Sequence, residues 1–119
     1  MEMKLANRSI YNLLELASAK KETITTTINH RKLGKTKALI QFAKDNKYYV
    51  LTGNETIAKL IKKEYGYRQV KGIDSMLDGL GPFFVFDECC PIEKIEKLKE
   101  SGFIILTGFE KDKDFYKGR

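Results

Sequence analysis

The chain has 119 residues, of which 32% are charged and 42% are hydrophobic, and its formal net charge is +6. This length suits one domain with one core, and no apolar run approaches the ~20 residues of a membrane-spanning helix. The first residues lack the apolar core of a signal peptide, so we expect a cytoplasmic protein. The positive charge favours an anionic partner, nucleotide or nucleic acid, or else it marks the solvated faces of lysine-rich helices.

The first half of the chain alternates between helix and strand patterns. Apolar residues at helical spacing predict an N-terminal helix over residues 6–21, and the β-branched run at 22–28 predicts a strand. A helix is then expected over 36–46, a short buried strand over 48–51 and a helix over 55–65. Within the first helix, Tyr11 has two interpretations: a base-stacking residue of a nucleotide site, or a residue that packs on the sheet.

The second half continues the alternation with one irregular part. Residues 67–82 are rich in turn residues, and a short edge strand is expected within 67–70. Two further apolar strands, at 83–86 and 103–106, flank a helix over 91–101.

Strand–helix alternation of this kind predicts an α/β fold. We expect residues 1–119 to form a single domain with a three-layer α/β/α core, in which helices cover both faces of a mainly parallel sheet of about four or five strands. Right-handed crossovers should connect the strands. Residues 109–119 alternate in charge and are expected to form a flexible tail.

The segment from Asn29 to Thr36 lies between the first predicted strand and the second predicted helix, and it ends in Gly-Lys-Thr. In this context, backbone N–H groups of the loop and of the first helical turn bind phosphate. Lys35 is expected to reach the β- and γ-phosphates, and the Thr36 hydroxyl is expected to bind Mg²⁺. The usual pattern begins with glycine where this chain has Asn29, a residue type that tolerates positive φ better than most. The predicted phosphate-binding residues are Asn29, His30, Arg31, Lys32, Leu33, Gly34, Lys35 and Thr36.

His30 and the two cysteines have no catalytic pattern around them. His30 has no carboxylate or serine at a readable spacing, so we assign it a role in shaping the loop. Cys89 and Cys90 are adjacent, with no second pair or histidine at zinc spacing, and we interpret both as reduced thiols.

Asp87 and Glu88 directly follow the apolar strand at 83–86. Ligands of parallel α/β sheets bind outside the carboxyl ends of the strands, so this pair is expected to face the Gly-Lys-Thr loop. Asp87 would complete the Mg²⁺ shell, and Glu88 would orient or deprotonate the attacking water. Alone, such a pair is a common helix cap, but together with Gly-Lys-Thr it favours a nucleoside triphosphatase.

These motifs resemble P-loop NTPases of the branch that carries an additional catalytic glutamate. Residues 31–36 are most similar to the deviant Walker A loop of viral, phage-like DNA-packaging (large terminase) ATPases and related helicase-like proteins, and residues 83–88 are similar to their Walker B strand. The resemblance implies that Arg31 is a cis-acting arginine finger, although a solvated loop residue is equally consistent, and that Thr107 is a sensor residue. It also implies a strand order of 48–51, 83–86, 103–106 and 23–28.

The expected function is therefore binding and Mg²⁺-dependent hydrolysis of a nucleoside triphosphate, ATP by preference. Hydrolysis would be coupled to nucleic acid or to a nucleic-acid-processing complex, in an oligomer if the chain acts as packaging motors do. The alternative is a catalytically weak or inactive module that acts through protein–protein interaction. It is favoured by the short length, by Asn29 and by the lack of a strand after the sensor strand. A small-molecule kinase is disfavoured because no lid or acceptor site is readable.

Overall fold

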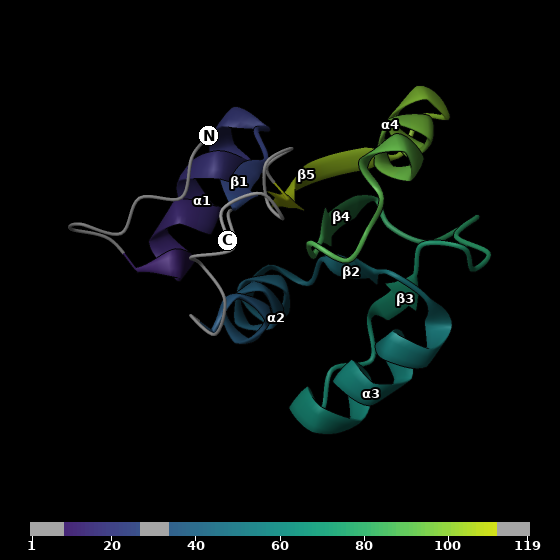
Figure 1. The fold of residues 1–119 in the computed structure, drawn as a ribbon, viewed down its shortest axis with the longest axis horizontal. Helices are drawn as coiled ribbons and strands as arrows, with labels where there is room; N and C mark the ends of the chain where they lie inside the picture. Colours follow the sequence, from purple (N-terminus) through teal and green to yellow (C-terminus); the bar gives the residue numbers. More distant parts are fainter. Residues whose placement is uncertain (1–8, 27–33, 112–119) are drawn as a thin grey trace, which may run out of the picture.

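A computed structural model describes residues 9–26 and 34–111. The four helices of this part of the chain are α1 (Ile10–Lys20), α2 (Lys35–Asn46), α3 (Glu55–Tyr65) and α4 (Ile92–Glu100). The five strands are β1 (Ile24–Thr26), β2 (Tyr49–Thr52), β3 (Val70–Gly72), β4 (Phe83–Phe86) and β5 (Ile104–Lys111). They form one sheet in the order β1-β5-β4-β2-β3, and every pairing is parallel (Figure 1).

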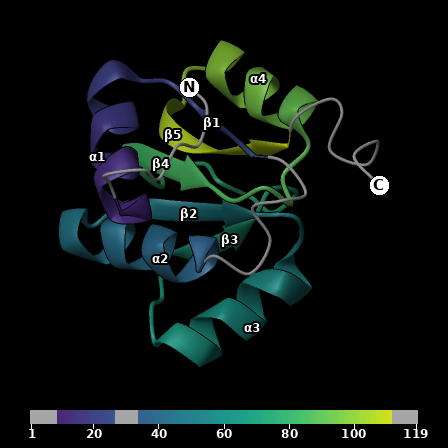
Figure 2. The ribbon, with the colours of Figure 1, turned by 60° about the vertical axis from the view of Figure 1, so that its left-hand side comes forward.

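Helices cover both faces of this sheet. The buried residues of α1, α2 and α3 form one core cluster with Val50, Val85 and Phe109, and α4 packs on the other face with Phe84 and Phe86. Figures 1 and 2 accordingly place α2 and α4 on opposite sides of the sheet. The connections through α2 and α3 lead toward the β3 edge of the sheet, whereas the connection through α4 leads toward the β1 edge. Because such crossovers are right-handed, α4 has to lie on the opposite face of the sheet from α2 and α3. The predicted three-layer α/β/α architecture is confirmed.

The predicted strand order is also confirmed, because β5 lies between β1 and β4. The edge strand next to β2 lies at Val70–Gly72, slightly later than the expected 67–70. Helix α3 has the predicted bounds and its caps follow from sequence: the Asn54 side chain accepts a hydrogen bond from the Ile57 N–H, and Gly66 ends the helix with a φ of 65°.

Strand β5 corrects one expectation. Residues 109–111 belong to this strand instead of to a flexible tail, and residues 112–119 lie outside the described part of the chain. The reason is the pairing with β1, which aligns Phe109 with Ile24 and buries the Phe109 side chain. The charged Glu110 and Lys111 belong to the end of a strand, where side chains are only partly buried.

Several other bounds also differ by a few residues. Helix α1 begins at Ile10 with Ser9 as its N-cap, and residues 6–8 of the predicted helix lie outside the described residues, as do residues 27 and 28 of the predicted strand. Pro91 is the N-cap of α4, which ends at Glu100. Within the described residues, no helix is long and apolar enough to cross a bilayer.

Candidate functional site

Three elements meet at the carboxyl edge of the sheet. The Lys35 Nζ, in the first turn of α2, lies 3.2 Å from the Glu88 Oε2, just after β4. The hydroxyl of Thr26, the last residue of β1, donates a 2.9 Å hydrogen bond to the same oxygen. The two motifs predicted to act together are therefore in direct contact.

Burial makes the ion pair between Lys35 and Glu88 more than a surface contact. The Lys35 side chain is only 8% exposed, whereas that of Glu88 is 23% exposed. A buried ammonium group needs an anionic partner, because removing it from water is otherwise costly. The buried cation of this pair is therefore Lys35, and water can reach its anionic partner Glu88.

The start of α2 places Lys35 at this edge. Gly34 precedes the helix with a φ of 78°, a left-handed conformation that glycine adopts without strain. As the N-cap residue, Gly34 provides no side-chain hydrogen bond to the first turn, and that turn contains no acidic residue. The first N–H groups of a helix lack intrahelical partners and carry the positive end of its dipole, which suits an anionic ligand.

Asp87 is buried beside the pair, with 6% of its surface exposed. Its Oδ1 accepts a 2.9 Å hydrogen bond from the Cys89 N–H. Burial raises the pKa of Asp87 to about 6, and the hydrogen bond from Cys89 and the nearby Thr52 hydroxyl oppose that shift. The Thr52 hydroxyl is itself fully buried and, within the described structure, makes no hydrogen bond of standard geometry.

The structure places the remaining predicted site residues as follows. Thr36 is partly buried in the first turn of α2, directly after Lys35. Asn29, His30, Arg31, Lys32 and Leu33 lie outside the described residues. The described part of the site therefore consists of Gly34, Lys35, Thr36, Asp87 and Glu88, joined by Thr26.

Thr107 does not join this group. It is buried inside β5 opposite Val85, and its hydroxyl donates a 2.7 Å hydrogen bond to the Glu22 carbonyl. The apolar run of the sequence stops at Leu106, which predicted a strand end there, but the strand continues to Lys111. Thr107 is thus within the sheet and not at its carboxyl edge.

Sequence reasoning missed Thr26. It belonged to a uniform β-branched run in which no residue stood out. The available signal was alternation: Ile24 and Thr26 share one side of the strand, and both are fully buried. A buried threonine at the end of a strand needs a hydrogen-bond acceptor, and Glu88 provides it.

A cavity of about 290 Å³ adjoins Glu88 between the ends of β4 and β5 and the start of α4. Both cysteines line it, together with Glu93, Glu110 and Lys111. Both thiols are free; Cys90 is buried and Cys89 is exposed, and partial desolvation raises the pKa of each thiol above its usual value. A raised pKa lowers the thiolate fraction and therefore the reactivity of both thiols.

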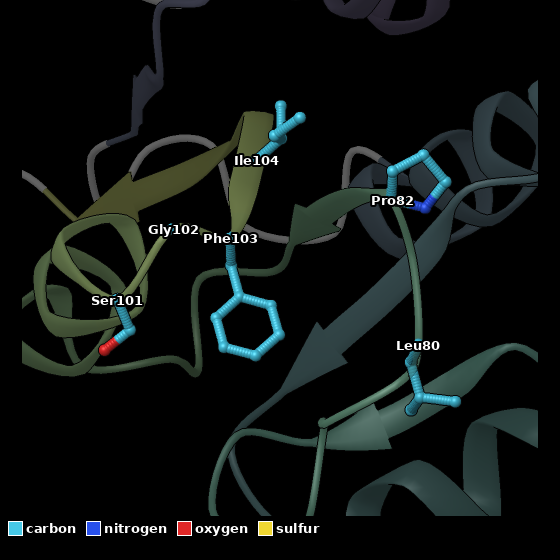
Figure 3. A pocket seen from close by; sticks show the side chains of 6 residues that line it. All are labelled: Leu80, Pro82, Ser101, Gly102, Phe103 and Ile104. Atoms are coloured by element: carbon cyan, nitrogen blue, oxygen red, sulfur yellow. The ribbon is translucent and has the colours of Figure 1, made fainter.

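A second cavity, of about 240 Å³, lies at the opposite edge of the sheet (Figure 3). In Figure 3, Phe103 projects between Leu80 and Pro82 on one side and Ser101 on the other. No titratable side chain lines this second cavity; its lining residues are Leu80, Pro82, Ser101, Gly102, Phe103 and Ile104. The lining is mainly apolar, with the Ser101 side chain as its polar member.

Tyr11 also lies away from the carboxyl edge. Its ring packs edge-on against Phe42 with centroids 5.7 Å apart, and its hydroxyl donates to Asp45. Both partners are near the C-terminal end of α2, whereas Lys35 is at the N-terminal end. These contacts fit a packing role, although they are made with α2 and not with the sheet as expected.

Comparisons with known proteins add no family assignment: no family model, no curated protein and no solved structure matches the chain. The contacts at the carboxyl edge are therefore the observations on which a function can be based.

Proposed function

We propose that the carboxyl edge of the sheet binds the phosphates of a nucleoside triphosphate, ATP by preference, and hydrolyses the terminal phosphate with the help of Mg²⁺. The observation that carries this proposal is the 3.2 Å contact between Lys35, in the first turn of α2, and Glu88, after β4. The contact joins a phosphate-binding type of residue to a carboxylate that can act on water, at the edge where parallel sheets bind ligands.

Phosphate binding is assigned to the start of α2. A phosphate oxygen would give the Lys35 ammonium an anionic partner in place of Glu88, so that the cation stays paired when nucleotide binds. The first N–H groups of α2, which Gly34 leaves without a side-chain cap, would bind further phosphate oxygens. Residues 29–33 lie outside the described part of the chain, and the sequence predicts that they bind further phosphate oxygens and that Arg31 adds positive charge.

The residues at this edge fit Mg²⁺. The Thr36 hydroxyl and the Asp87 carboxylate are oxygen ligands, which Mg²⁺ prefers, and the ion needs few protein ligands because waters and phosphates fill the other positions. The buried Thr52 hydroxyl, which lacks a hydrogen bond of standard geometry, is a further oxygen beside Asp87. When bound, Mg²⁺ would neutralise part of the phosphate charge.

Glu88 is assigned to the water. Its side chain is 23% exposed, so water can reach it, and transfer of Lys35 to a phosphate would release the carboxylate from its ion pair. Glu88 would accept a proton as the water oxygen attacks the γ-phosphorus, and the bond to the β-phosphate oxygen breaks to leave ADP and phosphate.

The test is a comparison of wild-type protein with Lys35→Ala in calorimetric titrations with Mg-ATP. Loss of a charged hydrogen-bonding partner should weaken affinity by about 10- to 100-fold. Lys63→Ala removes the same charge from an exposed position on α3 and is the matched control, which should bind like wild type. Equal affinity of wild type and Lys35→Ala would refute the assignment.

Phosphate release, measured with and without DNA or RNA, then separates two functions. Turnover supports the hydrolase. Wild-type protein that binds Mg-ATP and never turns it over would instead support the alternative, a module that binds nucleotide and acts through protein contacts.

A further inference from the structure

Thr26 makes contacts that its position in a short edge strand does not require. It is fully buried, and its hydroxyl carries one hydrogen with two acceptors in range. The Glu88 Oε2 lies 2.9 Å away and the Glu110 carbonyl oxygen lies 3.4 Å away. The shorter contact is to the charged oxygen, which is the stronger acceptor.

The Glu88 side chain has to reach across the sheet to make this contact. Glu88 follows β4, Thr26 ends β1, and β5 lies between these two strands. A glutamate side chain has several rotatable bonds and loses considerable freedom when one position is fixed. Threonine is β-branched and stiff, and here it is part of the sheet, so its hydroxyl is a rigid reference point.

We infer that Thr26 is a positioning residue: its hydroxyl fixes the Glu88 carboxylate beside Lys35, at the place where the carboxylate would meet the attacking water. This inference rests on the proposed hydrolytic function of the same site. Lys35 and Thr26 both contact the Oε2 of Glu88, so a single carboxylate oxygen carries both contacts.

The second acceptor gives the contact a further property. If Glu88 moves when Lys35 turns to a phosphate, the Thr26 hydroxyl can donate to the Glu110 carbonyl instead. A buried hydroxyl without a partner would oppose that movement, and the alternative acceptor removes the opposition. The Glu110 carbonyl therefore keeps the Thr26 hydroxyl paired at any moment when Glu88 does not accept its hydrogen bond.

Three single variants test the role by steady-state kinetics. Thr26→Val keeps the shape and removes the hydroxyl, and we expect kcat to fall about tenfold while KM stays within about twofold. Thr26→Ser keeps the hydroxyl and should restore most of the rate. Thr25→Val makes the same chemical change one residue earlier, on the opposite side of the strand, and should behave like wild type. A Thr26→Val protein with wild-type kcat, or a Thr26→Ser protein as slow as Thr26→Val, would overturn the inference.

A spectroscopic measurement separates this inference from the proposed hydrolysis. The side-chain carboxyl carbon resonance of Glu88 should shift in Thr26→Val and remain in place in Thr25→Val and Thr26→Ser. If wild-type protein shows no turnover but this shift occurs, hydrolysis fails and the positioning contact stands. If the resonance of Glu88 is the same in Thr26→Val and wild type, the positioning role is overturned whatever the turnover.

Discussion

The two edges of the sheet differ in chemistry although the same strands form both. At the carboxyl edge, a lysine, two carboxylates and two buried threonine hydroxyls lie together. One of the two acidic residues, Asp87, is only 6% exposed. At the amino edge, the cavity of Figure 3 has an apolar lining, and Phe83 and Ile104 are each 38% exposed. Among the described residues, the buried charged side chains are Lys35 and Asp87, and both lie at the carboxyl edge, where parallel sheets place ligands.

This difference also separates function from stability. Loss of a polar group at the carboxyl edge should affect ligand binding or turnover, and loss of an apolar group at the amino edge should affect only folding. The following predictions, from the largest expected effect to the smallest, test that division.

Glu88→Gln should have the largest effect. Glutamine keeps the size of the side chain but cannot accept a proton from water, so we expect turnover to fall by about 100-fold or more while Mg-ATP is still bound. Phosphate release under single-turnover conditions measures this. Glu96→Gln, an exposed position on α4, is the control. Full activity of Glu88→Gln would exclude Glu88 as the base.

Asp87→Asn should stabilise the nucleotide-free protein at neutral pH. The folded-state pKa of Asp87 is raised to about 6 from 3.8, so folding favours the protonated carboxyl. The protonated Asp87 carboxyl contributes fully to the stability of the folded protein below about pH 3.8, and this contribution is lost as the pH rises through about 6. Asparagine does not ionise, so the stability of the variant lacks this pH dependence. The unfolding free energy of the variant minus that of wild type should therefore be about 1–3 kcal/mol larger at pH 7.5 than at pH 4.

Urea denaturation of both proteins at the two pH values tests this prediction. A difference in unfolding free energy that does not change with pH would show that Asp87 is not a desolvated carboxyl.

Gly34→Ala and Gly66→Ala form a matched pair. Both glycines have positive φ, of 78° and 65°, and a Cβ would meet no atom within 4 Å at either position. Each variant should therefore lose about 1 kcal/mol of unfolding free energy through backbone strain alone. Only Gly34→Ala should also weaken Mg-ATP binding, because Gly34 starts α2 at the carboxyl edge and Gly66 ends α3. Equal binding by the two variants would argue against the start of α2 as the phosphate site.

Ile104→Ala should have the smallest effect. Its side chain is 38% exposed at the amino edge, so truncation should cost about 1 kcal/mol of stability or less and leave Mg-ATP affinity and turnover unchanged. Thermal denaturation and the same binding titration measure both quantities. A loss of affinity would show that the apolar edge also takes part in ligand binding, and the division between the two edges would not hold.

Much of this fold follows from sequence patterns. Helix α3 was predicted with its bounds because Asn54 and Gly66 are strong local signals for its two ends. The apolar runs of β2 and β4 are short and continuous, as buried parallel strands require, and this pattern predicted both strands. The closeness of Asp87 and Glu88 to the Gly-Lys-Thr loop was predicted from the rule that the carboxyl ends of parallel strands share one edge, whereas the ion pair between Lys35 and Glu88 was not predicted.

The rest depends on contacts between distant parts of the chain. The length of β5 is set by its pairing with β1, which aligns Phe109 with Ile24, and no local pattern indicates that pairing. The same pairing places Thr107 inside β5, whereas the sequence pattern predicted it directly after the end of a strand. The contact between Thr26 and Glu88 was not predicted, because alternation in the strand indicates only that Thr26 is buried, and Glu88 comes from two strands away in the sheet. Local sequence signals predict helices and their caps. Contacts between side chains on different strands can be predicted only when the register of the sheet is known.

The most direct test of the central claim is a nuclear magnetic resonance titration of the ¹⁵N-labelled protein with Mg-ATP. We expect the amide resonances of Gly34, Lys35, Thr36 and Glu88 to shift with increasing nucleotide, and those of Ser101 to Ile104 to stay in place. Shifts confined to the amino edge, or no shift at either edge at millimolar nucleotide, would contradict the assignment of phosphate binding to Lys35 and its neighbours.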